Sequence, residues 1–203
     1  MNKPLDAALM LNQFPDPAAA GNASLQATAL HAAAADPRRV PYAKPQPWGM
    51  VADLVEHEVL GDDERLWAPI GELSWSRPLH LNVTGGYYVH LLRVRRSGVL
   101  QRHRHSGAVH AYVIRGRWHY LEHDWVAETG SYVFEPPGET HTLVVPDDCS
   151  EMITLFTVHG ALMYVDPCGK ATGYDDVFTR IERYRAHFAA VGLGAEHVRH
   201  FMR

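Results

Sequence analysis

The chain has 203 residues, a net charge of −4 and two cysteines, which fits one globular domain with a core of its own. No apolar run approaches the roughly 20 residues that cross a bilayer, no dense basic patch marks a nucleic-acid surface, and Cys149 and Cys168 form neither a disulfide framework nor a Cys-x-x-Cys site. We therefore expect a cytoplasmic protein that binds neither membranes nor nucleic acids.

The first 46 residues are rich in alanine, proline and asparagine. A short helix is expected over Leu25–Ala35, where alanines accumulate, and Asp36-Pro37 should end it. We interpret residues 1–46 as an N-terminal arm and not as a domain. The sequence leaves open whether this arm moves freely or packs on a neighbouring subunit.

Residues 47–170 contain short apolar or alternating runs separated by turn signals, the pattern of an antiparallel barrel or jelly roll. No internal repeat is visible, so a single all-β barrel is expected. The predicted strands are Val51–Val55, Trp67–Ile70, Tyr87–Val94, Ala108–Arg115, Arg117–Glu122, Ser131–Glu135, Thr142–Val145, Glu151–Val158 and Ala161–Val165.

The last segment, residues 171–203, is expected to be helical and to pack on the barrel. Apolar residues recur there at spacings of four, three and four, namely at Val177, Ile181, Tyr184 and Phe188. This spacing indicates an amphipathic helix over residues 174–191. Asp175 or Asp176 can cap its start and Gly192 can end it.

Six of the 14 histidines lie between His103 and His141, and two phrases frame three of them: Gly98-x4-His103-x-His105 and Gly130-x5-Pro136-x-Gly138-x2-His141. Alternate side chains of a strand share a face, so His103 and His105 can point to one spot. The turn before His141 can bring it alongside from a neighbouring strand. Three imidazoles of this kind hold iron, manganese, nickel, copper or zinc and leave positions open for substrate. The plain alternative is a chance cluster of solvated histidines.

These phrases resemble the two motifs of the cupins, which implies a single cupin barrel of the jelly-roll, RmlC-like type. The first motif departs from the family pattern, because its glutamate is replaced by Val109 or His110. In this the chain resembles the three-histidine cupin dioxygenases that cleave carbon–carbon bonds, the acetylacetone and 2,4′-dihydroxyacetophenone dioxygenases. The resemblance is carried by residues 135–141, 152–156 and 160–166.

The resemblance implies an oxidoreductase with iron(II) bound to His103, His105 and His141. It implies dioxygenase chemistry, in which O2 is incorporated as a bond is cleaved in a small β-diketone or aryl α-hydroxyketone. It also places Glu135 near the metal, and Glu135 or Glu139 could serve as the base that removes a substrate proton. His110 stands where the glutamate is missing and could be a fourth ligand, a catalytic residue that orients a ligand, or an ordinary barrel histidine.

Two other functions remain open at this stage, because the barrel alone does not define an activity. One is a redox-neutral metal enzyme, such as an isomerase or a decarboxylase. The other is a regulatory cupin that binds metal without catalysis. For the dioxygenase, the expected partners are a small carbonyl substrate, O2 and further copies of the chain in a dimer or tetramer.

Overall fold

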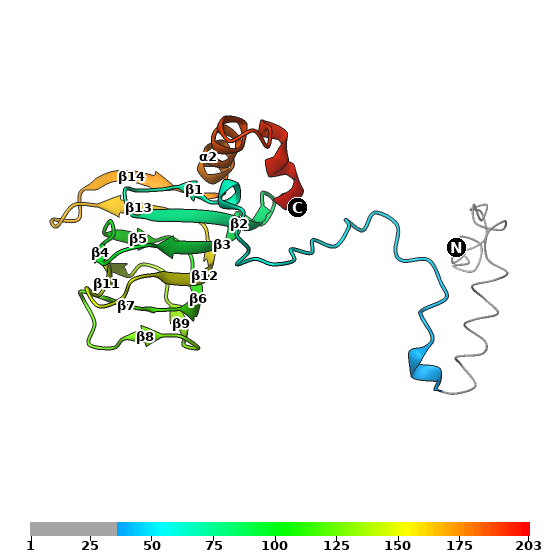
Figure 1. Ribbon diagram of the computed structural model, residues 1–203, viewed down its shortest axis with the longest axis horizontal. Helices are drawn as coiled ribbons and strands as arrows, with labels where there is room; N and C mark the ends of the chain where they lie inside the picture. Colours follow the sequence, from blue (N-terminus) through cyan, green and yellow to red (C-terminus); the bar gives the residue numbers. More distant parts are fainter. Residues whose placement is uncertain (1–35) are drawn as a thin grey trace, which may run out of the picture. The chain divides into compact units, whose positions relative to one another are not determined.

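The computed structural model describes residues 36–203 (Figure 1). The chain divides into two units, residues 1–50 and 51–203. In the first unit the described residues contain the short 3-10 turn η2 (Pro37–Arg39), and the Asp36 side chain caps it. The helix predicted over Leu25–Ala35 lies outside the described residues.

The second unit is built from short antiparallel strands in three sheets (Figure 1). The largest sheet has the order β1 (Ala68–Pro69), β2 (Ser74–Asn82), β3 (Tyr87–Val94), β12 (Met152–His159), β6 (Val109–Arg115) and β9 (Tyr132–Glu135). A second sheet has the order β10 (Thr140–His141), β5 (His103–His105), β13 (Leu162–Val165) and β14 (Ala171–Asp175). The third has the order β4 (Gly98–Val99), β11 (Leu143–Val145), β7 (Arg117–Tyr120) and β8 (Ala127–Glu128).

Strands of all three sheets contribute to one buried core, which confirms the predicted all-β fold. Along β6 and β12, buried side chains alternate with more exposed ones, as expected when one face of a strand is turned inward. The largest completely buried apolar side chains on the strands of the three sheets are those of Trp118, Tyr88, Tyr120, Leu81, Leu91 and Met152.

Three differences between the predicted and the observed strands have local reasons. Residues 51–55 form no strand, so that prediction is wrong. Strand β2 was not predicted, because Pro78 interrupts its apolar pattern and several of its buried side chains are polar, among them Ser76 and Arg77. Strand β14 was also missed, since its first four residues are exposed and include Gly173.

The C-terminal helix α2 (Val177–Ala190) confirms the predicted amphipathic helix. Asp176 caps it through a reciprocal pair: the Thr179 amide donates to Asp176 Oδ1 over 2.8 Å, and the Asp176 amide donates to Thr179 Oγ1 over 2.7 Å. The helix packs against β1, β2, β14 and the 3-10 segment η4 (Ala195–Phe201). Another 3-10 turn, η3 (Glu64–Leu66), precedes β1. Within residues 36–203, no helix has the length and apolar character needed to cross a bilayer.

The two phenylalanines of α2 allow a matched test of how this helix is held. Phe188 is completely buried, whereas Phe178 is 58% exposed. We expect Phe188→Ala to lower the free energy of unfolding by about 3–5 kcal/mol, because it opens a cavity in the core. Phe178→Ala should change it by less than about 0.5 kcal/mol. Urea denaturation of both variants measures the difference, and equal effects would contradict the observed packing.

Candidate metal centre

The histidines of the two motifs meet because β5 and β10 pair side by side. Their antiparallel register places His141 directly opposite His103. The preceding turn is tied to β5, since the Gly138 amide donates to the carbonyl of His105 over 2.9 Å. Gly138 has φ +91°, a conformation that favours glycine. The Pro-x-Gly-x2-His spacing thus positions the third histidine beside the first two, as predicted.

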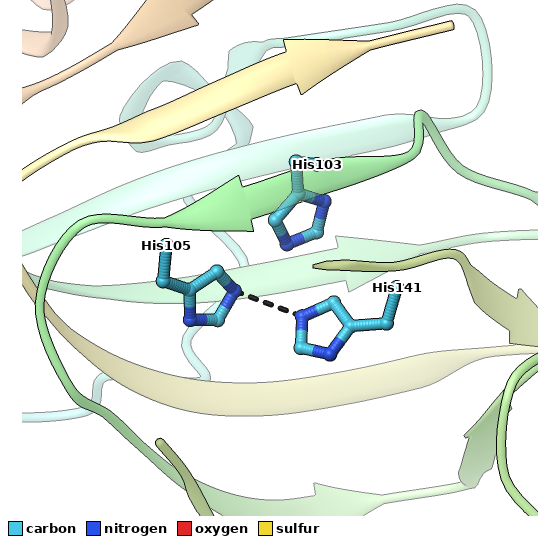
Figure 2. Close-up of side chains that lie close together, drawn as sticks. All are labelled: His103, His105 and His141. Carbon is cyan, nitrogen blue, oxygen red and sulfur yellow. Dashed lines mark hydrogen bonds between the residues drawn. The ribbon is translucent and has the colours of Figure 1, made fainter. Parts of the chain in front are cut away.

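The three imidazoles fit a single metal ion (Figure 2). One nitrogen from each of His103, His105 and His141 lies within 4.8 Å of the others, and the Nε2 atoms of His105 and His141 are 2.9 Å apart. Two nitrogens bound at about 2.1 Å and at right angles to each other would be about 3.0 Å apart. The His141 ring stands at 78° to both other rings, so the three do not stack on one another in a single column. The predicted convergence is confirmed.

Each ligand candidate is kept in the neutral form that can bind a metal. Burial lowers the pKa of His103, and it lowers the pKa of His105 to about 3 and that of His141 to about 2. The Nδ1–H of His103 donates to the carbonyl of Gln101 over 2.9 Å, which leaves its Nε2 lone pair free. These histidines can therefore hold a divalent ion without first losing a proton.

Tyr120 connects the histidine cluster to a buried carboxylate. Its ring stacks on the His141 ring with centroids 3.6 Å apart and planes at 9°. Its hydroxyl donates to Glu135 Oε1 over 2.7 Å. No motif in the sequence points to Tyr120, because its position between His141 and Glu135 depends on how β7 packs.

Glu135 lies at the cluster, where the resemblance placed it. Its Oε2 atom is 3.3 Å from His105 Nε2 and 3.7 Å from His141 Nε2. Among the described residues, this buried oxygen has no hydrogen-bond partner. Burial raises the pKa of the Glu135 carboxyl to about 7, although the Tyr120 hydroxyl opposes the shift. The Tyr120 hydroxyl thus holds Glu135 Oε1, and Glu135 Oε2 faces the Nε2 atoms of His105 and His141.

Glu135 also explains the missing glutamate of the first motif. On β9 it pairs directly with Val109 on β6, one of the two positions where that glutamate was expected. Both side chains are buried and line the same cavity. The carboxylate therefore enters the site from the strand next to the usual one.

The structure does not bring His110 to the cluster, which corrects its prediction as a catalytic residue. Val109, Ala111 and Val113 are the buried residues of β6, so His110 points to the opposite face. There its Nδ1 is hydrogen-bonded to the Tyr132 hydroxyl over 2.7 Å. Its side chain is not part of the cavity wall.

Glu139 and His123 lie at the other ring nitrogen of His141. Glu139 Oε2 is 3.9 Å from His141 Nδ1, and its Oε1 is 2.7 Å from His123 Nε2. The side chains of His123, Glu139 and His141 are close enough to hold a second ion. Glu139 thus lies on the Nδ1 side of the His141 ring and not beside the Nε2 atoms of His105 and His141.

A cavity of about 440 Å³ opens beside the cluster and is lined by His103, His105 and Glu135. Most of its wall is apolar, and its volume falls in the range of small-molecule sites. Further polar side chains reach the wall, among them those of His90, Tyr164 and Arg180. No motif in the sequence points to Arg180, because only the packing of α2 brings it to the cavity.

Residues 55–163 match the family model described as the ChrR Cupin-like domain. An RmlC-like cupin protein from Ralstonia eutropha JMP134 is similar in structure, with 29% identity, coverage of 62% of this chain and 83% of that one, and a TM-score of 0.60. An acetylacetone dioxygenase from Acinetobacter johnsonii has 18% identity, coverage of 70% and 99%, and a TM-score of 0.56, which shows a shared fold. No curated protein sequence matches the chain.

Proposed function

The chain belongs to the ChrR cupin-like family, and within that family we propose that it is a non-heme iron(II)-dependent dioxygenase. The proposed reaction cleaves a carbon–carbon bond of a small β-diketone or aryl α-hydroxyketone. The observation that carries this proposal is the convergence of three neutral imidazoles, those of His103, His105 and His141, beside a largely apolar cavity. The fold shared with an acetylacetone dioxygenase agrees with it.

A site of three neutral ligands suits a substrate that binds as an anion. Bound iron(II) supplies Lewis acidity for the carbonyl oxygens and the redox chemistry for O2. His103, His105 and His141 would hold it without adding negative charge, so an enolate remains strongly attracted. The apolar wall of the cavity excludes water from the enolate.

Glu135 is the residue placed to remove the substrate proton. Its free Oε2 atom reaches the cavity next to His105, while Oε1 accepts the Tyr120 hydrogen bond. A carboxylate held in this way can take a proton from the carbon next to a carbonyl group. When the carbon–carbon bond then breaks, each fragment takes one atom of O2, so the products contain every oxygen atom of the substrate and of O2.

Oxygen consumption by the iron(II)-reconstituted protein tests this function. With acetylacetone or 2,4′-dihydroxyacetophenone, we expect one O2 to be consumed for each substrate lost. The zinc-loaded protein is the control and should consume none, because zinc has no redox chemistry. Equal turnover with zinc and without O2 would indicate an isomerase or decarboxylase. Bound iron without any turnover would favour the regulatory role.

A further inference from the structure

Arg180 is a residue of α2, and its buried side chain lies on the wall of the same cavity. Its side chain is 3% exposed and lines the cavity that also contains His103 and His105. Figure 1 shows α2 next to β14. Strand β14 pairs with β13, and β13 pairs with β5, which carries the two histidines. A charged side chain in such a place requires compensation.

Asp175 supplies only part of that compensation. Its side chain is completely buried, and its Oδ2 atom forms an ion pair with Arg180 Nη2 at 2.7 Å and accepts a hydrogen bond from Arg183 Nη1 over 2.9 Å. Its Oδ1 atom accepts from the Thr179 hydroxyl over 2.7 Å. Two guanidinium groups thus share one carboxylate, and the side chain of Arg183 is 34% exposed whereas that of Arg180 is buried.

The guanidinium of Arg180 also has unused donors. Among the described residues, its Nε and Nη1 atoms have no hydrogen-bond partner although both are buried. The ring of Tyr88 lies 5.1 Å from its Cζ atom, and the Tyr88 hydroxyl is likewise without a partner. Buried donors are normally satisfied, so this cluster lacks an acceptor.

Tyr164 links this cluster to the histidine site. Its hydroxyl donates to Asp175 Oδ2 over 3.3 Å. Its ring packs edge-on against His103, with centroids 6.4 Å apart. Tyr164 and Arg180 both line the cavity, so one ligand can face the histidines and the guanidinium together.

We propose that Arg180 binds a carboxylate group of the substrate, which is then a carbonyl compound that carries a carboxylic acid. This inference rests on the proposed function for the carbonyl end of the molecule. A carboxylate can pair with a guanidinium group through two parallel hydrogen bonds. It also supplies the acceptor that the unused nitrogens of Arg180 lack. A purely structural ion pair between α2 and β14 would leave those donors unsatisfied.

Anaerobic binding to the iron(II) protein, measured by calorimetry, tests the proposal without turnover. The probes are two acids, 2,4-dioxopentanoate and 4,6-dioxoheptanoate, and their counterparts with methyl in place of carboxylate, acetylacetone and 2,4-heptanedione. We expect at least one acid to bind roughly 10–100-fold more tightly than its counterpart. Arg180→Gln should remove this preference, so that the ratio of the dissociation constants of each acid and its neutral counterpart falls to about one.

Two further variants show whether a lost preference for acids comes from the missing Arg180 side chain or from misfolding. Arg183→Gln removes the other guanidinium partner of Asp175 but not a cavity residue, so it should retain the preference for acids. Arg180→Lys keeps a positive charge beside Asp175 but loses the planar fork, so it should fold and bind the acid less tightly. Circular dichroism establishes that each variant is folded.

The outcomes separate this proposal from the proposed reaction. If neither acid is preferred by the unmodified protein, or if folded Arg180 variants keep the preference, Arg180 does not bind a carboxylate. If acids are preferred through Arg180 but no O2 is consumed, the carboxylate site stands and the dioxygenase reaction is wrong. If all diketones are cleaved alike and Arg180→Gln changes nothing, the reaction stands and the carboxylate site is wrong.

Discussion

Replacing His141 by alanine is expected to abolish metal binding and, with it, turnover. His141 shares the candidate site with His103 and His105, and its Nε2 atom is 2.9 Å from that of His105. Removing one of three ligands should lower activity by more than the roughly 10–100-fold typical of residues that only orient a ligand. Metal analysis of the purified variant should give almost no iron per chain, against one for the unmodified protein.

His119→Ala is the matched control for this substitution. His119 lies on β7 between Trp118 and Tyr120, which are both buried, so its side chain points to the other face of the strand. It should keep full metal content and activity. Thermal unfolding establishes that both variants are folded. A folded His141→Ala protein with one tightly bound iron would exclude His141 as a ligand.

Glu135→Gln is expected to reduce turnover by roughly 10²–10⁴-fold while the metal stays bound, because a carboxamide cannot accept the substrate proton. The glutamine keeps an oxygen for the Tyr120 hydroxyl, which donates to Glu135 over 2.7 Å. The measurement is the rate of O2 consumption per bound iron. Separate metal analysis distinguishes a lost base from a lost ligand.

Tyr120→Phe accompanies this test. It keeps the ring that stacks on His141 but removes the hydrogen bond to Glu135, so it should slow turnover less than Glu135→Gln does. If Glu135→Gln loses iron as His141→Ala does, then Glu135 is itself a ligand. If it keeps both iron and full activity, Glu135 has no part in the reaction.

The elements that could be predicted from the sequence are those determined by local spacing. The period of α2 and its Asp176 cap lie within one short segment, and so does the His-x-His pair on β5. Strand β2 was missed because its buried face is partly polar: the Ser76 hydroxyl is hydrogen-bonded to His90 and to Tyr184, which lies on α2. Only the packed structure shows why such residues can face inward.

The three histidines were predictable for the same reason, whereas their surroundings depend on long-range pairing. Glu135 reaches the site through its register with Val109, and Arg180 reaches the cavity through the packing of α2. No local pattern indicates either contact. The error at His110 was avoidable, because the apolar residues Val109, Ala111 and Val113 alternate along β6 and place His110 on the opposite face.

Labelling with ¹⁸O2 tests the central claim most directly. The iron(II)-reconstituted protein is supplied with ¹⁸O2 and a substrate that it consumes, and mass spectrometry follows both products. The three-histidine dioxygenase predicts one ¹⁸O atom in each fragment, and no labelled product from His141→Ala. Cleavage products that contain oxygen only from water, or products formed equally well without O2, would contradict it.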